Sequence, residues 1–292
     1  MGAGVFCKNC TDQQGSKNEY RPGGQKMITL YESGQEFLEA NRDYLNTRPY
    51  ASVFFFADAP LLTHADKINY AMRVTQGEKM LLALKTEPYN LLLFGAPECV
   101  PELAACLFGN GYNVKNFHGE ERVGDRMAKV LWDNYDLVYT EALAMDFLEA
   151  REITEPSSEE VEPAVPEDLN EICTLMERFV IDCGLLDKVS REKTEETITR
   201  FRVLRRNGQI ASIAKGVPSG GPDVRITNVY TRNEYRGQGL ARKVVNTLKN
   251  EILASGKTAT LNVDKKNPIS YHIYQELGFK KKFSQGEYRK VL

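Results

Sequence analysis

The stretch Asn228-Val-Tyr-Thr-Arg-Asn-Glu-Tyr-Arg-Gly-Gln-Gly-Leu-Ala-Arg242 predicts a strand, a loop with two glycines and the start of a helix in direct succession. Glycine lets the backbone approach a ligand closely and take unusual dihedral angles. The first turn of a helix leaves N–H groups unpaired at the positive end of the helix dipole. We therefore expect residues 236–242 to bind an anion such as a pyrophosphate, mainly through backbone amides, with Arg236 and Arg242 adding charge.

Two other phosphate-binding loops fit this stretch poorly. The Gly-Lys-Ser/Thr ending of a nucleoside triphosphatase loop is absent. The third glycine of a dinucleotide-binding loop is also absent, and no acidic residue is well placed after the next strand. A simple tight turn with a glycine cap remains open from this stretch alone.

A second stretch follows about 28 residues later, Asn267-Pro-Ile-Ser-Tyr-His-Ile-Tyr-Gln-Glu-Leu-Gly-Phe279. Asparagine suits the N-cap of a helix and proline its first position. Asn267 and Tyr274 are seven residues apart, so they share one helix face. A separate stripe is predicted to meet the core: Ile269, Ile273 and Leu277. Tyr274 at the edge of this stripe also fits a half-buried core tyrosine, and His272 is expected at the surface.

Together the two stretches resemble the signature pair of the GNAT acetyltransferase superfamily, R-x-x-G-x-A/G followed by N-x-x-[AS]-x-x-x-Y-x-x-x-GF. The residues of and next to both motifs are most similar to those of predicted bacterial-type acetyltransferases with a degenerate GNAT-like N-terminal half. The resemblance is strong over residues 161–292 and weak over 27–153. In the weaker half, Phe94-Gly-Ala-Pro-Glu98 has one glycine and a proline where an amide donor is needed, so we expect no CoA binding there.

The resemblance implies an α/β fold with an α+β mixed sheet, a C-terminal GNAT fold and a second GNAT-like N-terminal domain. It implies acetyl-CoA as co-substrate and no metal. The pantetheine arm would pair with the strand Val229-Tyr230-Thr231 and would bind Asn267. The Val229 N–H would stabilise the oxyanion, and Tyr274 would protonate the departing thiolate as the catalytic acid. The pyrophosphate would lie on the amides of Arg236, Gly237, Gln238, Gly239, Leu240, Ala241 and Arg242.

The implied activity is N-acetyl transfer to a primary amine of a small molecule or a peptide, by direct attack on the thioester. The alternative is a non-catalytic CoA-binding or scaffold protein that retains the fold. The presence of both Tyr274 and Asn267 favours the enzyme. The general base stays unassigned, with Asp223, Glu234 and Asp264 as candidates by sequence proximity alone. The acceptor, the acyl-chain preference and the oligomeric state are left open.

Charge and hydropathy bear on two questions, whether the protein binds nucleic acid or a membrane and in which compartment it lies. The net charge of −2 shows no basic excess, so nucleic acid is not expected as a partner. No apolar run approaches the roughly 20 residues of a membrane span. The first residues lack the order of a secretory signal, so a cytoplasmic location with reduced thiols is expected. Cys7 and Cys10 are interpreted as exposed thiols on a flexible tail rather than a metal site.

The chain is predicted to divide into a flexible extension (1–26), a degenerate GNAT-like α/β domain (27–153), a linker (154–160) and a GNAT acetyltransferase domain (161–292). Val53–Phe56 is predicted as a short strand, and Phe279–Leu292 as a closing pair of strands. Asn207-Gly208 predicts a two-residue hairpin turn. The acidic, polar composition of 154–160 is typical of a linker.

Overall fold

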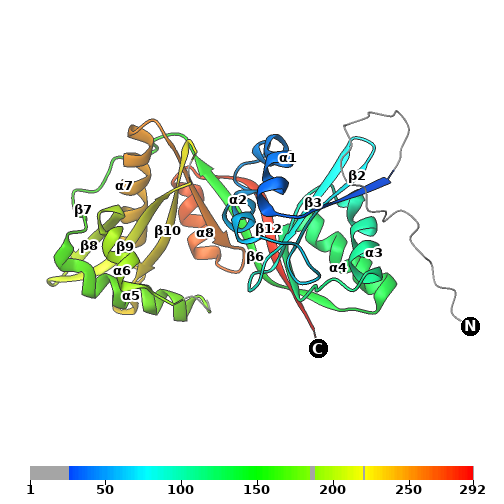
Figure 1. Cartoon of the computed structure of the whole chain (residues 1–292). Coiled ribbons are helices and arrows are strands. Elements are labelled where there is room, and N and C mark those ends of the chain that lie inside the picture. Colours follow the sequence, from blue (N-terminus) through cyan, green and yellow to red (C-terminus); the bar gives the residue numbers. More distant parts are fainter. Residues whose placement is uncertain (1–25, 185–187, 220, 292) are drawn as a thin grey trace, which may run out of the picture. The chain divides into compact units, whose positions relative to one another are not determined.

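The computed structural model describes residues 26–184, 188–219 and 221–291, which belong to two compact units (Figure 1). Unit 1 contains the residues up to Ala144 together with those from Ser284 onward, and unit 2 is Met145–Phe283. Residues 1–25 of the predicted extension, with Cys7 and Cys10, lie outside the described residues, and a strand begins at Lys26. The domain boundaries drawn from the sequence stay a prediction.

From Lys26 onward, the first half of the chain contains six strands, four helices and two short 3₁₀ turns. In order they are β1 Lys26–Tyr31, α1 Gly34–Asn46, α2 Val53–Asp58, η1 Ala59–Leu61, β2 Tyr70–Gln76, β3 Lys79–Lys85, β4 Leu91–Gly95, η2 Pro97–Cys99, α3 Val100–Gly109, β5 Asn116–Glu120, α4 Glu121–Tyr135 and β6 Tyr139–Ala150.

The second half repeats this order of strands and helices when the 3₁₀ turns are set aside. Its elements are β7 Val161–Pro163, η3 Pro166–Asp168, α5 Leu169–Asp182, α6 Arg191–Glu196, η4 Ile198–Arg200, β8 Phe201–Arg206, β9 Gln209–Pro218, β10 Asp223–Thr231, η5 Asn233–Tyr235, α7 Leu240–Ala254, β11 Thr258–Asp264, α8 Pro268–Glu276 and β12 Lys280–Lys290.

Strand pairing repeats as well. In unit 1 the order is β1-β2-β3-β4-β5-β12, and in unit 2 it is β7-β8-β9-β10-β11-β6. Every neighbouring pair within each unit is antiparallel except β4–β5 and β10–β11, which are parallel. The two halves of the chain are therefore tandem copies of one topology.

The last strand of each copy completes the other unit. Strand β6 follows the helices of the first half, yet its residues Met145–Ala150 pair with β11 in unit 2. Strand β12 follows α8, yet its residues Gln285–Arg289 pair with β5 in unit 1. The mixed α/β fold expected from the sequence is confirmed, and the exchange of the sixth strands is a finding of the structure.

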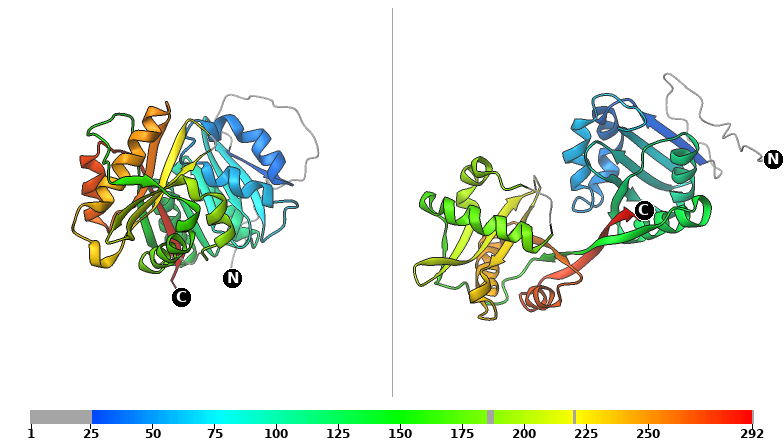
Figure 2. Two further views of the ribbon diagram at one scale, coloured as in Figure 1. Left: turned by 90° about the vertical axis from the view of Figure 1, so that its left-hand side faces the viewer. Right: turned by 90° about the horizontal axis from the view of Figure 1, so that it is seen from below.

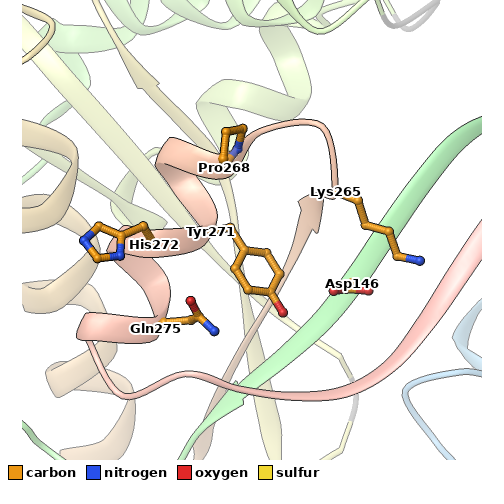
Figure 3. Close-up of a pocket in the computed structure, with 6 residues that line it drawn as sticks. All are labelled: Asp146, Lys265, Pro268, Tyr271, His272 and Gln275. Carbon is orange, nitrogen blue, oxygen red and sulfur yellow. The ribbon is translucent and has the colours of Figure 1, made fainter.

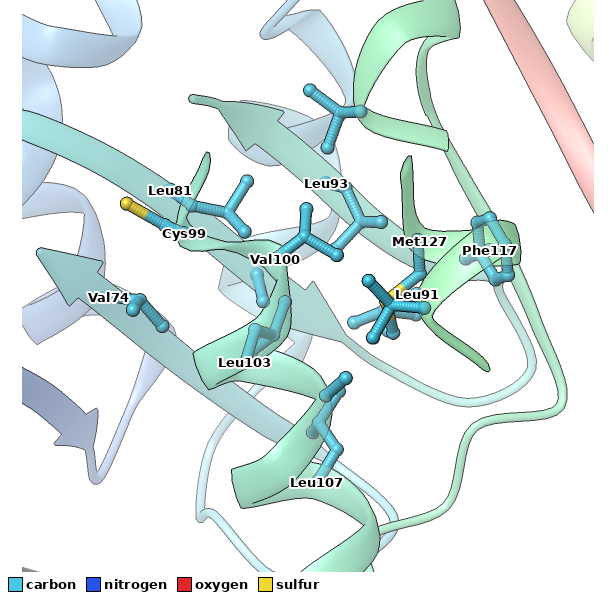
Figure 4. Packing of buried hydrophobic residues seen from close by; sticks show 14 of the residues in the cluster. Val74, Leu81, Leu91, Leu93, Cys99, Val100, Leu103, Leu107, Phe117 and Met127 are labelled. Carbon is cyan, nitrogen blue, oxygen red and sulfur yellow. The ribbon is translucent and has the colours of Figure 1, made fainter. Parts of the chain in front are cut away.

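Helices cover both faces of the strands within each unit (Figures 1 and 2). In unit 1, α1 and α2 enclose one apolar cluster, and α3 and α4 enclose a second cluster on the opposite face (Figure 4). In unit 2, α5 lies on one face, and α7 and α8 lie on the other. This arrangement gives each unit its own core on both sides of its strands.

Three sequence predictions were wrong in detail. Val53–Phe56 starts helix α2, because Phe55 packs against Phe37 and Phe94 and tertiary contacts override the strand preference of its aromatic residues. The described residues 279–291 contain one strand, β12, whose partner strand β5 lies outside that segment. Ile269 is 74% exposed rather than in the core, since it lies in the first turn of α8.

The hairpin prediction is confirmed by the backbone. Asn207 and Gly208 have φ values of 52° and 76° and join β8 to β9. Positive φ at both central residues is the requirement of a type I′ turn.

The segment 154–160 is bound to helix α7 along its length. Asn250 Nδ2 donates to the Glu155 carbonyl oxygen at 2.9 Å, and Asn246 Nδ2 donates to that of Pro156 at 2.8 Å. The fully buried Lys249 Nζ donates to Thr154 Oγ1 at 3.0 Å and to the carbonyl oxygen at the C-terminus of α8 at 2.9 Å. This segment is thus an ordered part of unit 2 and fixes the end of α8 to α7.

Within the described part of the chain, no helix combines the length and the apolar character that crossing a membrane requires.

The strand exchange predicts which fragment can fold. A fragment of residues 145–283 retains the β6 segment that pairs with β11, whereas a fragment of residues 161–292 lacks it and exposes the edge of β11. Exposed edges promote association. We expect the first fragment to be monomeric in gel filtration and to unfold cooperatively in urea, and the second to be less stable or aggregated. Equal urea midpoints for the two fragments would show that β6 is dispensable.

Candidate functional site

A gap opens in unit 2 where β10 and β11 stop pairing. Their parallel register runs from Asp223↔Thr258 to Ile226↔Leu261. The next residues of β10 contain a register shift, and Asn228 there has a φ of 50°. Such a bulge bends and twists a strand. Beyond it, β10 pairs with β9 but not with β11, so one side of its backbone has no strand partner.

The unpaired side of β10 carries the backbone groups of Val229 and Thr231. The Arg232 N–H donates to the Ala211 carbonyl of β9 at 2.9 Å. Backbone groups of successive residues in a strand point to opposite sides. Those of Tyr230 therefore face β9, whereas those of Val229 and Thr231 face the gap. The predicted pairing strand thus presents donors and acceptors toward the gap.

The loop after β10 leads to an uncapped helix. Gly237 and Gly239 have φ values of 77° and 73°, and Gly239 is the N-cap of α7, where no side chain accepts from the first turn. A Cβ at either position would meet no atom within 4 Å, so these glycines are required by backbone conformation rather than by crowding. Residues 236–239 are exposed, and Leu240 buries its side chain. The amides in this loop are therefore available to an anion.

The two arginines of the loop are engaged by carboxylates. Arg242 Nη2 donates to Glu155 at 2.7 Å, and Arg242 also binds Glu276. Arg236 Nη2 donates to Asp182 Oδ2 at 2.8 Å, and its Nε donates to the Thr231 carbonyl at 3.1 Å. Because both guanidinium charges are paired, the backbone amides are the donors of this loop that stay available.

Helix α8 carries the other predicted residues. Asn267 is exposed, and its Oδ1 caps the helix by accepting from the Ser270 N–H at 3.0 Å. Tyr274 is 7% exposed and contacts Phe279 edge-on. Burial raises the pKa of Tyr274 to about 12, while a hydrogen bond with Ser270 opposes the shift. The phenol therefore stays protonated at neutral pH, as a proton donor must.

A shallow pocket lies on another side of α8 (Figure 3). Tyr271 points toward Asp146 there, and burial followed by Asp146 raises the pKa of its phenol. His272 is 72% exposed and lies 3.4 Å from Glu276, in agreement with the expected surface position. This pocket contains none of the predicted cofactor residues. Its lining consists of Asp146, Lys265, Pro268, Tyr271, His272 and Gln275.

The three candidate bases occupy different places. Asp223 lies at the start of β10, is 4% exposed, and accepts from Thr260 Oγ1 at 3.3 Å. Its position at the paired end of β10 separates it from the gap. Glu234 is exposed in η5. Asp264 ends β11, beside the gap.

Two further residues near the gap were not found by sequence analysis. Asp182 and Cys183 end α5, and Tyr230 Oη donates to Asp182 Oδ2 at 3.3 Å. The Cys183 thiol has its pKa raised by burial and then by Asp182 and Asp264, with Arg236 opposing. Asp182 precedes Tyr230 by 48 residues in the chain, so no local pattern indicates this contact.

The corresponding loop of unit 1 differs in each of these respects. Gly95 has a φ of 136°, and a Cβ there would lie 2.2 Å from the Met80 carbonyl oxygen. Pro97 and Pro101 remove two N–H donors from the helix start. Glu98 adds a carboxylate that pairs with Lys79 at 2.5 Å. These features disfavour anion binding in unit 1. Among the residues with described positions, no cluster of three or more potential metal-ligating side chains occurs.

Comparison with known proteins finds a sequence match around the two motifs and similar folds over most of the chain. Residues 219–289 match the family model of FR47-like proteins. A GNAT-family acetyltransferase from Colwellia psychrerythraea has a similar structure, with a TM-score of 0.62 at 13% identity over 91% of this chain and 100% of that chain. A GCN5-related N-acetyltransferase from Sphaerobacter thermophilus gives a TM-score of 0.55 at 15% identity over 90% of this chain and 95% of that chain. These likenesses confirm the fold that the two motifs predict.

Proposed function

We propose that the chain is a member of the GNAT superfamily and that unit 2 transfers an acetyl group from acetyl-CoA to a primary amine by direct attack on the thioester. The observation that carries this proposal is the gap beside β10, with Val229 and Thr231 facing it and the uncapped start of α7 at its end. An extended arm with amides and a pyrophosphate matches this arrangement of backbone groups.

The residues would divide the cofactor between them. Val229 and Thr231 would pair with the pantetheine amides as a neighbouring strand would, and Asn267 at the start of α8 would bind the same arm. Residues 236–242 would hold the pyrophosphate through their N–H groups. The hydrogen bond from Arg236 Nε to the Thr231 carbonyl oxygen would have to break before a pantetheine amide could donate to that oxygen.

In the transfer step the amine nitrogen forms a bond to the thioester carbon, and the carbon–sulfur bond breaks. The Val229 N–H would stabilise the oxyanion of the tetrahedral intermediate. Tyr274 would give its proton to the departing thiolate, and its raised pKa keeps that proton in place until the sulfur becomes basic. The amine releases its own proton to solvent or to a carboxylate.

The second candidate is a CoA-binding protein without catalysis. Such a protein would need the loop and the gap but not the buried phenol of Tyr274. The presence of Tyr274 therefore favours the enzyme. Loss of its hydroxyl should lower the rate of acetyl transfer by an enzyme, whereas a CoA-binding protein would show no such rate.

Acetyl-CoA binding tests the loop. Trp in place of Gly239 would strain a positive-φ position and fill the space over the first amides of α7. We expect Gly239→Trp to weaken acetyl-CoA binding at least about tenfold in isothermal titration, a loss of about 1.4 kcal/mol or more.

Gly256 is a matched control at the other end of α7. It has a φ of 75° and equally open surroundings, so Gly256→Trp should carry similar backbone strain yet leave acetyl-CoA affinity unchanged. Absence of binding by the wild-type protein would rule out the proposal.

Replacing Tyr274 by Phe tests whether its phenol donates the proton to the departing thiolate. We expect Tyr274→Phe to lower kcat for acetyl transfer about a hundredfold or more in a thiol-release assay over a panel of amines. The affinity for acetyl-CoA should be unchanged. Because the pKa is about 12, the loss should be the same from neutral pH up to about pH 10.

Tyr271 provides the comparison, since its phenol lies one turn earlier on α8 in the pocket of Figure 3. Tyr271→Phe should retain the wild-type kcat. Equal activities of wild type and Tyr274→Phe would assign proton donation to another group.

A further inference from the structure

Two partly buried cations on the strands of unit 2 stand apart from their neighbours. The three arginines of β8 each bind a carboxylate, in the pairs Arg202–Glu251, Arg205–Asp168 and Arg206–Glu160. In contrast, the side chains of Lys215 in β9 and Arg225 in β10 form no hydrogen bond and no ion pair with any described residue. A charge withdrawn from water without a partner is costly. A ligand of opposite charge would remove this cost.

Both side chains lie on the face of the sheet that α5 covers. Val224 and Ile226 pack with residues of α7 in the core of the other face. Side chains alternate along a strand, so Arg225 between them points to the α5 side. On β9, Ile213 packs in the cluster that α5 encloses, and Lys215 two residues later lies on the same side.

The strand register makes the two residues diagonal neighbours. Lys215 is opposite Thr227 on β10, and Val217 is opposite Arg225. Diagonal neighbours in an antiparallel pair lie roughly 7–8 Å apart, within reach of each other for long side chains. A multi-atom anion can therefore contact both positive groups.

The surroundings of Lys215 are apolar or positively charged. Its Nζ lies 5.0 Å from the centre of the Phe201 ring. Burial and then the charge of Arg200 lower the pKa of Lys215. The ring face attracts the ammonium group, but it does not offset the charge as a carboxylate would.

The carboxylate nearest to Arg225 along β10 is engaged elsewhere. Asp223 accepts from the hydroxyls of Ser219 and Thr260, and not from the guanidinium. Burial lowers the pKa of Arg225, and Asp223 only opposes this shift. The donors of the guanidinium are thus left for an external oxyanion.

This place is separate from the loop that is proposed to hold the pyrophosphate. Arg225 lies where β10 is still paired with β11, opposite Thr260. It points away from α7, whereas residues 236–239 lead into the start of that helix. An anion at Arg225 would therefore occupy the other face of the sheet.

We propose that Arg225 and Lys215 bind the oxyanion group of a small ligand, a carboxylate or a phosphoryl group, on the α5 face of unit 2. The planar guanidinium matches two oxygens of such a group, and the ammonium adds a point charge. The bound oxyanion offsets the repulsion between the two cations. This site goes beyond the acetyl transfer proposed above and does not depend on it.

Lys215 reports on the ligand, because a bound oxyanion stabilises its ammonium and covers it. The full-length protein is treated near neutral pH with N-hydroxysuccinimidyl acetate, and the rate at Lys215 is followed by peptide mass spectrometry. Sodium succinate and sodium phosphate are the probes, with sodium chloride of equal ionic strength as the reference. We expect one or both probes to slow Lys215 roughly tenfold, the effect of one pKa unit. Lys129, exposed on α4, should keep its rate.

The two probes separate the two kinds of ligand. Protection by succinate alone assigns a carboxylate to the site, and protection by phosphate alone assigns a phosphoryl group. Protection by both assigns an oxyanion of either kind. If neither probe protects Lys215, the site is ruled out.

Arg225→Gln removes the guanidinium charge and retains an amide donor. The protection of Lys215 should be lost in this variant. Arg206→Gln is the matched control, since Arg206 lies on the strand β8 and its charge is paired with Glu160. The control should keep the protection of the wild type. Protection that survives in Arg225→Gln overturns the proposal.

Urea unfolding separates loss of the site from loss of the fold. A ligand that binds only the folded state stabilises it, so the protecting probe should raise the urea midpoint of the wild type and not that of Arg225→Gln. In sodium chloride the variant should be at least as stable as the wild type, because it removes an unpaired charge. A variant that is clearly less stable in sodium chloride would show that the protein itself satisfies Arg225, against the proposal.

Acetyl-CoA titration distinguishes this site from the proposed cofactor site. Arg225→Gln should bind acetyl-CoA with the affinity of the wild type. Loss of acetyl-CoA binding in this variant would assign Arg225 to the cofactor and contradict the separate oxyanion site. Protection of Lys215 in a protein that does not bind acetyl-CoA would contradict only the acetyltransferase.

Discussion

From Asp223 to Ile226 the strands β10 and β11 are bound as a parallel pair, and from Asn228 onward β10 pairs with β9 but not with β11. The strained backbone at Asn228, with its φ of 50°, is the point at which the two strands part. This divergence turns the backbone of Val229 and Thr231 into a surface that an extended ligand can use. It also aligns that surface with the uncapped start of α7, because the loop after Thr231 leads directly into that helix.

The polar side of α7 holds the remaining parts of the site in place. A buried lysine in a helix is costly unless its donors are satisfied, and Lys249 satisfies them on Thr154 and on the end of α8. Burial lowers the pKa of Lys249, because removal from water disfavours the charged ammonium. Arg242 adds a second connection through Glu155 and Glu276. The helix that carries Tyr274 is therefore fixed to the helix that carries the anion-binding loop.

The two copies of the topology share one strand order but differ in the residues of the loop after the fourth strand of each unit. Unit 1 has prolines and a crowded glycine in its loop after β4, whereas unit 2 has two uncrowded glycines in its loop after β10. Each copy supplies the sixth strand of the other unit, through Met145–Ala150 and Gln285–Arg289. The first copy thereby contributes core residues such as Leu148 to unit 2.

The sequence by itself determined the fold class, most helices and strands of the second half, and the loop and helix that carry the candidate site. It could do so because those features are local: glycines at a helix start, an N-cap asparagine and a tyrosine seven residues later are read within one stretch. Only the tertiary structure decided the strand exchange, the helical state of Val53–Asp58 and the contact of Asp182 with Tyr230 and Arg236. Those depend on contacts between residues far apart in the chain, which no local periodicity encodes.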